Sequence, residues 1–276
     1  MKVKLQPWCV SQVRLNWPVL TLMAVVGLIL SGLGSSAVLA ETEAIETGEV
    51  QTAQVFESGP QRVTVLELYS SQGCNNCPPA ERWMSELKHD DKLWQQVVPL
   101  VFHVDYWDAL GWQDPYAALR HSQRQRMYQV HGYSAAVYTP GFILAGEEWT
   151  GWFQSQELPS LSQPEVGQLK VEVADGKAVA TFVRSQSSRG LVLNVAMLGF
   201  DIVTEVKQGK NKGLALRQDF VVLNHKAFSS DSGEWSVEMP TTDFQGRTAA
   251  AFWVSQNSDP TPLQATGGWY QPSARQ

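Results

Sequence analysis

Residues 63–79 read VTVLELYSSQGCNNCPP, and the interpretation of the whole chain starts from this stretch. Arg62 to Tyr69 is rich in apolar and β-branched residues, which predicts a strand, and the turn-prone Ser-Ser-Gln-Gly that follows ends it. Pro78-Pro79 predicts the start of a helix, because the first helical turn leaves its backbone N–H groups without internal partners. Cys74 and Cys77 therefore lie between a strand and the first turn of a helix.

The first forty residues have the features of a signal peptide. A basic start precedes an uncharged apolar run, Trp17–Leu33, and small residues lead up to Ala40. We therefore expect cleavage after about Ala40 and a periplasmic or secreted protein, with an uncleaved membrane anchor as the alternative. No later stretch is apolar enough to cross a bilayer, so no stable membrane insertion is expected after cleavage.

Cleavage would remove Cys9 and leave only Cys74 and Cys77 of the three cysteines. Two cysteines cannot form a disulfide framework or a four-thiolate zinc site. The removed segment has three basic and no acidic residues, so the net charge of −6 becomes −9. An acidic chain of this kind lacks the basic patch of nucleic-acid-binding proteins.

The remainder of the chain predicts two domains. Residues 41–60 have no clear period and predict a flexible leader. Residues 61–155 predict a strand, a helix and further strands, with an inserted segment at about 106–132. Residues 156–167 contain two prolines and predict a linker. Residues 168–270 alternate in short runs separated by turns, which is typical of an all-β sandwich-like domain.

The cysteine spacing predicts redox chemistry. A helix N-terminus favours the thiolate over the thiol, so Cys74 is expected to be the exposed nucleophile and Cys77 the buried resolving cysteine. A structural disulfide is one alternative, although so short a loop restricts the unfolded chain little. A metal site with His103 as third ligand is another.

Four motifs resemble a bacterial family of exported, thioredoxin-like proteins that is known as a domain of unknown function. They are Gly73-Cys-Asn-Asn-Cys-Pro-Pro79, Phe102-His-Val-Asp-Tyr-Trp-Asp108, Gly111-Trp-Gln-Asp-Pro115 and Val137-Tyr-Thr-Pro140, and the loop Val206–Gly213 fits the same family. The resemblance runs from about Val63 to Val254. It implies the thioredoxin-like fold but no substrate. Together with the alternation after residue 168, the expected fold class is an α/β thioredoxin-like domain followed by the all-β sandwich-like domain.

Thr139 and Pro140 match the cis-proline position of thioredoxins. A cis bond before proline is only slightly less stable than trans, and the turn would expose the backbone of Thr139 to an extended peptide substrate. An ordinary trans proline at the start of an edge strand is the alternative.

Further polar residues are candidates for proton transfer. Glu67 resembles the buried acid beneath the resolving cysteine of many thioredoxins, with a solvent-facing position as the alternative. His103 and Asp105 share a strand face, so the acid could orient the imidazole beside the thiols. These two residues and Asp108 could instead bind a metal, or hold the following segment in place.

Within residues 108–132, turn residues are followed by a predicted polar helix that carries three arginines. Arg120, Arg124 and Arg126 are most simply a solvated helix face.

The leading hypothesis is a thiol–disulfide oxidoreductase of the cell envelope that acts on protein thiols or disulfides without a cofactor. A non-catalytic binding protein with a structural disulfide is the second hypothesis. Copper handling through both thiolates and His103 is the third. The residues Asn75-Asn76 between the cysteines do not set the redox direction.

Overall fold

The computed structural model of the protein describes residues 53–271. The predicted signal peptide and Cys9 lie outside these residues. Of the described residues, 42% are in strands and 15% in helices, so β-structure dominates the described part of the chain, although both α-helices precede the predicted linker.

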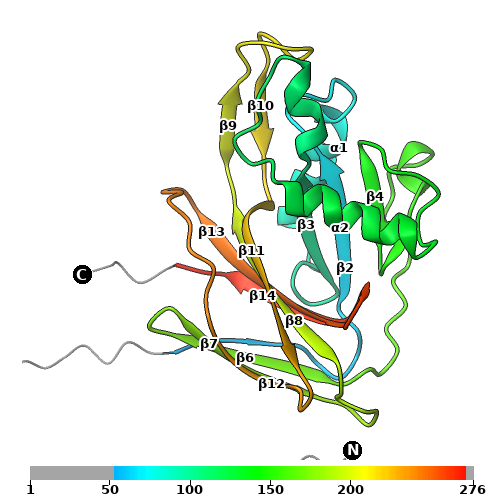
Figure 1. Ribbon diagram of the computed structural model, residues 1–276, viewed down its shortest axis with the longest axis vertical. Coiled ribbons are helices and arrows are strands. Elements are labelled where there is room, and N and C mark those ends of the chain that lie inside the picture. Colours follow the sequence, from blue (N-terminus) through cyan, green and yellow to red (C-terminus); the bar gives the residue numbers. More distant parts are fainter. Residues whose placement is uncertain (1–52, 272–276) are drawn as a thin grey trace, which may run out of the picture. The chain divides into compact units, whose positions relative to one another are not determined.

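An eight-stranded mixed sheet forms the centre of the described structure (Figure 1). Only the β2–β3 and β3–β11 pairs are parallel; every other pair of neighbours is antiparallel. In order across the sheet, its strands are β14 (Asp259–Trp269), β13 (Thr248–Gln256), β8 (Leu191–Gly199), β11 (Val221–Ser230), β3 (Val97–His103), β2 (Thr64–Ser70), β4 (Gly141–Leu144) and β5 (Glu147–Glu148).

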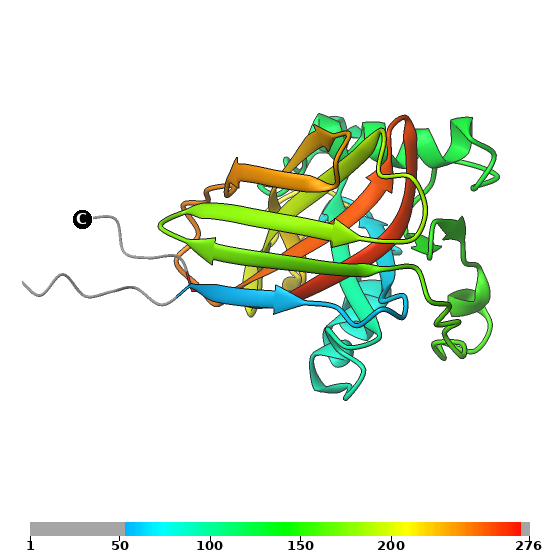
Figure 2. The same cartoon turned by 90° about the horizontal axis from the view of Figure 1, so that it is seen from below.

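A four-stranded antiparallel sheet packs beneath the large sheet (Figure 2). Its strands in order are β1 (Gln54–Glu57), β6 (Gln168–Ala174), β7 (Lys177–Val183) and β12 (Glu234–Glu238). β1 falls within the segment that was expected to be a flexible leader. It is ordered there because it pairs with β6 and buries Phe56 in the core.

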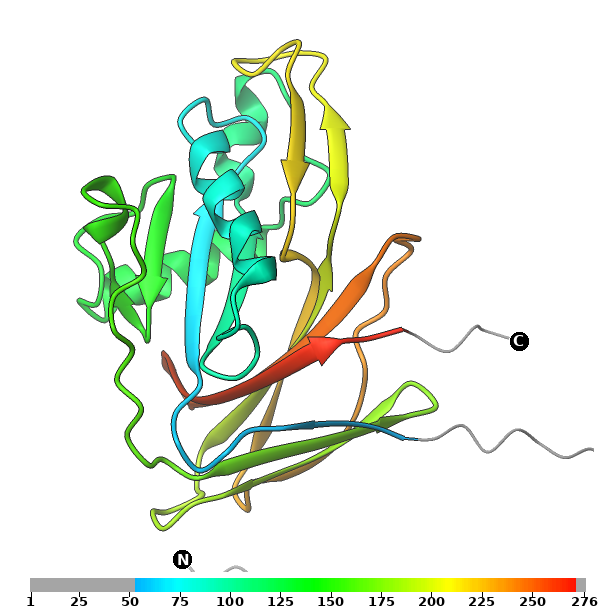
Figure 3. The same cartoon turned by 180° about the vertical axis from the view of Figure 1, so that it is seen from behind.

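Two helices cover opposite faces of the β2–β3 part of the large sheet, α1 (Pro78–Glu86) and α2 (Leu119–Val130) (Figures 1 and 3). Short 3₁₀ helices occupy Leu87–His89, Asp105–Leu110 and Gly151–Phe153. No helical segment between residues 53 and 271 combines the length and the apolarity that a bilayer crossing requires.

A separate two-stranded hairpin projects from the large sheet next to α1. Its strands are β9 (Ile202–Glu205) and β10 (Ala215–Gln218). They follow the end of β8 and precede the start of β11, so the hairpin continues this inner strand pair beyond the large sheet. Figure 3 shows this hairpin beside α1, with its connecting loop at the N-terminal end of the helix.

The large sheet buries apolar side chains on both faces. Along β8, Leu193 and Val195 belong to the core shared with the four-stranded sheet. Ala196 and Leu198 belong to the core on the side of the helices. The same strand therefore contributes to two cores.

The predicted fold class, an α/β thioredoxin-like domain followed by an all-β sandwich-like domain, is wrong. Four strands from the second half of the chain, β8, β11, β13 and β14, extend the same sheet that contains β2 and β3. The result is a predominantly antiparallel, β-rich structure with only two α-helices among residues 53–271.

Candidate functional site

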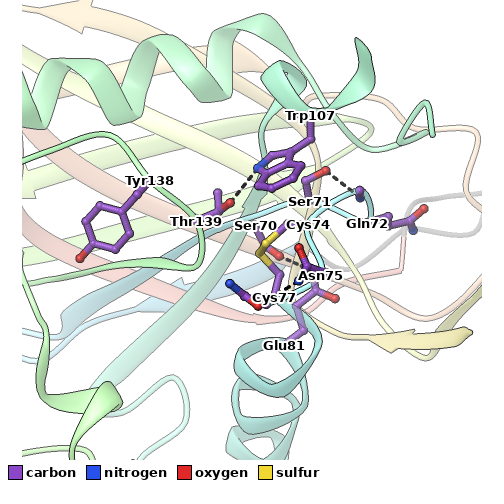
Figure 4. Close-up of a disulfide and its surroundings, with 12 residues drawn as sticks. Ser70, Ser71, Gln72, Cys74, Asn75, Cys77, Glu81, Trp107, Tyr138 and Thr139 are labelled. Carbon is purple, nitrogen blue, oxygen red and sulfur yellow. Dashed lines mark hydrogen bonds between the residues drawn. A yellow bond between two sulfur atoms is a disulfide. The ribbon is translucent and has the colours of Figure 1, made fainter. Parts of the chain in front are cut away.

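Cys74 and Cys77 form a disulfide at the start of α1 (Figure 4), with their Cα atoms 5.4 Å apart. Cys77 is the N-cap residue of the helix and Pro78 occupies its first turn. The helix start that the Pro-Pro pair predicts is therefore confirmed. The sulfur atoms lie at the end of the helix whose unpaired N–H groups favour negative charge.

Both cysteines are buried. Cys74 is 1% exposed and Cys77 is fully buried, whereas Asn75 and Asn76 between them are exposed. The expectation that Cys74 is an exposed nucleophile is wrong for this oxidised form. Trp107, beside Gly73, and Asn211, bonded to the Cys74 carbonyl, approach the disulfide loop from later in the chain, which local sequence patterns do not reveal.

The peptide bond between Thr139 and Pro140 is cis, as predicted. Trp107 links this turn to the disulfide loop. Its Nε1 donates a 2.8 Å hydrogen bond to Oγ1 of Thr139, and its Cβ lies 3.2 Å from the place where a Cβ on Gly73 would be. Figure 4 shows Trp107 and Thr139 on one side of the disulfide and Glu81 on the other.

Glu81 is a buried acid one helical turn after Cys77. Its backbone N–H donates a 3.1 Å hydrogen bond to the Cys77 carbonyl, and the residue is 3% exposed. Its carboxylate accepts hydrogen bonds from the Ser70 hydroxyl and from the Gln218 amide. The carboxylate therefore lies on the α1 side of the sheet, where the cysteines are.

His103, the last residue of β3, connects Glu81 to a second carboxylate. Its Nε2 lies 3.7 Å from Oε1 of Glu81, and its Nδ1 lies 2.7 Å from Oδ2 of Asp114. Asp114 also accepts hydrogen bonds from the backbone N–H groups of Gln72 and Tyr116, at 2.7 and 2.9 Å. The three side chains form a buried row of acid, imidazole and acid.

The acid that orients His103 is therefore Asp114, and the assignment of this role to Asp105 is wrong. Asp105 instead accepts a hydrogen bond from the hydroxyl of Ser122 on α2. The two residues were expected to share a strand face, but β3 ends at His103 and a 3₁₀ helix begins at Asp105. Strand periodicity no longer applies beyond His103.

Burial and the neighbouring charged or hydrogen-bonding groups shift the pKa values of these three side chains in opposite directions. Burial raises the pKa of Glu81, and the opposing effects of His103 and its hydrogen-bond donors do not cancel the rise. Burial disfavours protonation of His103, but the Asp114 and Glu81 carboxylates outweigh it and raise the pKa of His103. Burial also acts against ionised Asp114, yet His103 and the backbone donors lower the pKa of Asp114.

Glu67 does not lie beneath the resolving cysteine. On β2 its side chain shares a face with Tyr69, whose hydroxyl donates to Glu67 at 2.7 Å. Ser70, which contacts Glu81, faces the other way, as alternation along a strand requires. The prediction that Glu67 transfers the proton of Cys77 is therefore wrong, although its burial at 1% exposure is confirmed.

Glu67 is instead the centre of an ion pair on the α2 side of the sheet. Arg124 donates to it from Nε at 2.9 Å and from Nη2 at 2.7 Å, and Tyr128 donates at 2.6 Å. The guanidinium also lies 5.2 Å from the ring centre of Trp253. The interpretation of Arg124 as part of a solvated helix face is wrong, while Arg120 and Arg126 are exposed.

A pocket of about 320 Å³ lies between α1 and β10. Glu81 lines it together with Pro78, Arg82 and Leu216, so the buried acid adjoins a solvent-accessible cavity. Among residues 53–271, no three histidine, cysteine or carboxylate side chains converge in a way that could hold a metal ion.

Sequence reasoning missed Glu81, Asp114, Gln218 and Asn211. The position of Glu81, four residues after Cys77 on a predicted helix, is a signal that could have identified it. The other three come from a loop and from the β9–β10 hairpin, far along the chain from the cysteines. Asp114 and Asn211 lie in the family motifs Gly111–Pro115 and Val206–Gly213, but no local pattern brings these residues to the cysteines.

The comparisons with known proteins identify relatives but no activity. The model of the family described as "Protein of unknown function (DUF1223)" matches residues 65–255. No curated protein matches the chain.

Two solved structures share the fold. One is protein AGR_C_4864 from Agrobacterium tumefaciens, with a TM-score of 0.51 and 21% identity over 79% of this chain and 97% of that one. The other is HBP35 of Porphyromonas gingivalis, with a TM-score of 0.50 and 13% identity over 79% of each chain. At these identities the likeness concerns the fold alone.

Proposed function

We propose that this chain, which belongs to the DUF1223 family of proteins of unknown function, is a thiol–disulfide oxidoreductase that acts on protein partners through Cys74 and Cys77. The signal-peptide features of residues 1–40 support an activity in the cell envelope. No organic cofactor is required, because the two sulfur atoms carry the electrons.

One observation carries the proposal: the buried row Glu81–His103–Asp114 is joined to the disulfide loop at both ends, by the Glu81 N–H to the Cys77 carbonyl and by the Gln72 N–H to Asp114. Two buried carboxylates next to a disulfide are expensive to desolvate, and a bridge that only joins neighbouring residues gains nothing from them. A carboxylate with a raised pKa is a stronger base, which suits removal of a proton from a buried thiol.

The reaction proceeds in two exchanges. The Cys74 thiolate attacks a partner disulfide, which forms a mixed disulfide and releases the first partner thiolate. Cys77 then loses its proton toward Glu81, and its thiolate attacks the Cys74 sulfur. The Cys74–Cys77 bond forms as the mixed disulfide breaks and the second partner thiolate leaves.

The electrons and protons balance across these steps. Two electrons pass from the cysteine pair to the partner, and the two thiol protons end on the partner's two thiols. Run in reverse, the same steps oxidise a partner dithiol. Thr139 and Pro140 would position the partner, because Thr139 lies beside the disulfide (Figure 4), where its backbone could pair with an extended peptide.

Trapping of a mixed disulfide tests the proposal. In a Cys9→Ser background, reduced Cys77→Ser protein mixed with a peptide disulfide should accumulate a covalent adduct on Cys74, detected by mass spectrometry. Cys74→Ser protein should not. If neither variant forms an adduct, and the reduced parent protein reduces the peptide no faster than its Cys74→Ser variant, the proposed activity is lost.

A second candidate has its own support, because both sulfur atoms are buried. In this alternative the disulfide is static and the chain is a binding protein. A static bridge resists reduction by the glutathione pool, so the reduction potential of the pair separates the two candidates.

A further inference from the structure

Residues 206–214, which connect β9 to β10, are here named the capping loop. The loop is closed internally: the Val206 N–H donates to the Leu214 carbonyl at 2.9 Å, and the Leu214 N–H donates to the Asn211 carbonyl at 3.0 Å. Lys207, Lys210 and Lys212 are exposed, but Asn211 between them is only 3% exposed. A buried amide in the middle of a lysine-rich loop indicates a specific inward contact.

Asn211 makes that contact with the disulfide loop. Its Nδ2 donates 2.9 Å hydrogen bonds to the carbonyls of both Gln72 and Cys74. The side-chain amide thus uses both of its N–H groups on the backbone that precedes and carries the first cysteine. Residues more than 130 positions apart in sequence are joined at this point.

The capping loop also contacts the segment that carries Trp107 and Trp112. A Cβ on Gly209, whose φ is +73°, would lie 3.1 Å from Cβ of Trp112. The Lys210 ammonium lies 4.9 Å from the centre of the Trp107 ring. The loop and the tryptophan segment therefore contact each other and both contact the disulfide loop, in which Cys74 is 1% exposed.

Thiol–disulfide exchange needs direct approach of a second sulfur to Cys74, and access is one of the factors that sets its rate. We propose that the capping loop is a gate on the cysteine pair, that Asn211 is the positioning residue that keeps it closed, and that exchange requires the loop to move away. This inference rests on the proposed function for its biological meaning, but the gating of Cys74 is measurable without it.

Besides the packing of Gly209 against Trp112, the contacts that hold the capping loop in place are weak polar ones. Two neutral hydrogen bonds and one exposed cation–π contact each contribute little net stability. Opening therefore needs no unfolding of the sheet, because β9 and β10 pair outside the eight-stranded sheet.

Thiol labelling tests the gate. In the full chain with Cys9→Ser, reduced protein is alkylated with iodoacetamide, and the rate at Cys74 is measured by mass spectrometry at several pH values. The pH series gives the pKa of Cys74, so that access and ionisation are separated. Asn211→Ala should raise the rate about tenfold at unchanged pKa, which corresponds to about 1.4 kcal/mol of lost gate stability. Lys207→Ala, an exposed change in the same loop, should leave the rate unchanged.

Two further variants keep the result interpretable. Asn211→Asp has the same size but cannot donate to the two carbonyls, so it should reproduce the effect if Asn211→Ala folds poorly. Trp107→Ala tests whether the tryptophan beside the disulfide loop shields Cys74. If Trp107→Ala speeds labelling and neither Asn211 variant does, the tryptophan alone shields Cys74 and the gate is overturned. Faster labelling without any exchange activity would keep the gate and reject the proposed function.

Discussion

Nδ1 of His103 lies 2.7 Å from Oδ2 of Asp114, and both side chains are completely buried. The pKa of His103 is raised and the pKa of Asp114 is lowered, because each charge stabilises the other against the effect of burial. The pair therefore stabilises the folded state only in the pH range where both groups are charged.

The first prediction concerns the pH dependence of this pair. Asp114→Asn should lower the free energy of unfolding by about 3–5 kcal/mol near pH 6, because it leaves a buried charge without its partner. The His103 contribution is complete below about pH 6.5 and is lost as the pH rises through its folded pKa. The Asp114 contribution is present above about pH 3.9 and is lost as the pH falls through its folded pKa.

Urea unfolding of wild type and Asp114→Asn from about pH 3 to about pH 9 measures this difference, which should be bell-shaped. Asp105→Asn is the matched control, since Asp105 bonds Ser122 and does not contact His103. It should leave the pKa of His103, followed by NMR, unchanged. A difference that is constant over the whole pH range would contradict the assignment of Asp114 as the partner.

A second prediction concerns Glu81. Glu81→Gln should slow closure of the mixed disulfide by about 100-fold, the lower end of the range for general acid–base catalysis. The wild-type closure rate should rise as the pH passes through the raised pKa of Glu81, because the ionised carboxylate is the base. The variant should lack this rise.

Release of a chromophoric thiol from the mixed disulfide measures the closure rate. Glu86→Gln on the same helix is the control, because Glu86 is exposed and lies outside the buried row. If Glu81→Gln keeps the wild-type rate and pH profile, the buried acid has no part in closing the disulfide.

How much of this could be predicted from the sequence depends on how local each signal is. The strand before the cysteines, the helix that begins at the prolines and the turn at Thr139-Pro140 are set by neighbouring residues, and they are found where predicted. Short strands separated by turns are also found within residues 168–270, as the alternation there predicts.

The fold class could not be predicted, because it depends on which strands pair. The alternation of β6 and β7 correctly indicates one buried face. β8 and β13 are buried on both faces, so they join the large sheet rather than a separate sandwich. The parallel contact between β11 and β3, Val221 against Val101, links segments that no local pattern relates.

The residues of the candidate site could be predicted only in part, again because local patterns do not show which distant segments meet. Glu67 and Glu81 are both buried acids close to the cysteines in sequence. Glu67 points to the face of β2 that carries Tyr69, whereas Glu81 on α1 meets Ser70 on the opposite face, which is the side of the sheet where the cysteines lie. Asp114 replaces Asp105 beside His103 because the chain leaves the strand geometry after His103. The hydrogen bond to the Cys74 carbonyl comes from Asn211, more than 130 residues further along the chain.

A third prediction separates stability from chemistry. Arg124→Met should lower the free energy of unfolding by about 3–5 kcal/mol, because it leaves the Glu67 carboxylate buried without its cation. The exchange rate of the folded variant should be unchanged, since this pair lies on the opposite face of the sheet from Glu81.

The control for this variant is Arg126→Met, an exposed change on the same helix, which should alter stability by no more than about 0.5 kcal/mol. Denaturant unfolding and the mixed-disulfide assay, run on the same preparations, give both quantities. Loss of exchange activity in folded Arg124→Met protein would mean that the two buried clusters are coupled.

The fourth prediction concerns the redox balance of the pair itself. A disulfide with a sequence separation of 3 closes a very short loop, so removing it by Cys74→Ser and Cys77→Ser together should lower stability by only about 2 kcal/mol. Little of the folding free energy then depends on the disulfide. Because folding therefore does little to resist its reduction, the reduction potential of the Cys74–Cys77 pair should lie in the range of disulfides that exchange with partners. Equilibration with glutathione or dithiothreitol buffers, read by mass spectrometry after acid quenching, should place the midpoint between about −120 and about −270 mV. A midpoint below about −300 mV is typical of a structural bridge, and such a value would favour the binding protein over the oxidoreductase.

Because Asn211 bonds the Cys74 carbonyl in the oxidised form, equilibration in the Asn211→Ala protein should be faster while the midpoint stays close to wild type. A gate changes the rate at which the pair equilibrates, whereas the environment of the two sulfur atoms sets where the equilibrium lies.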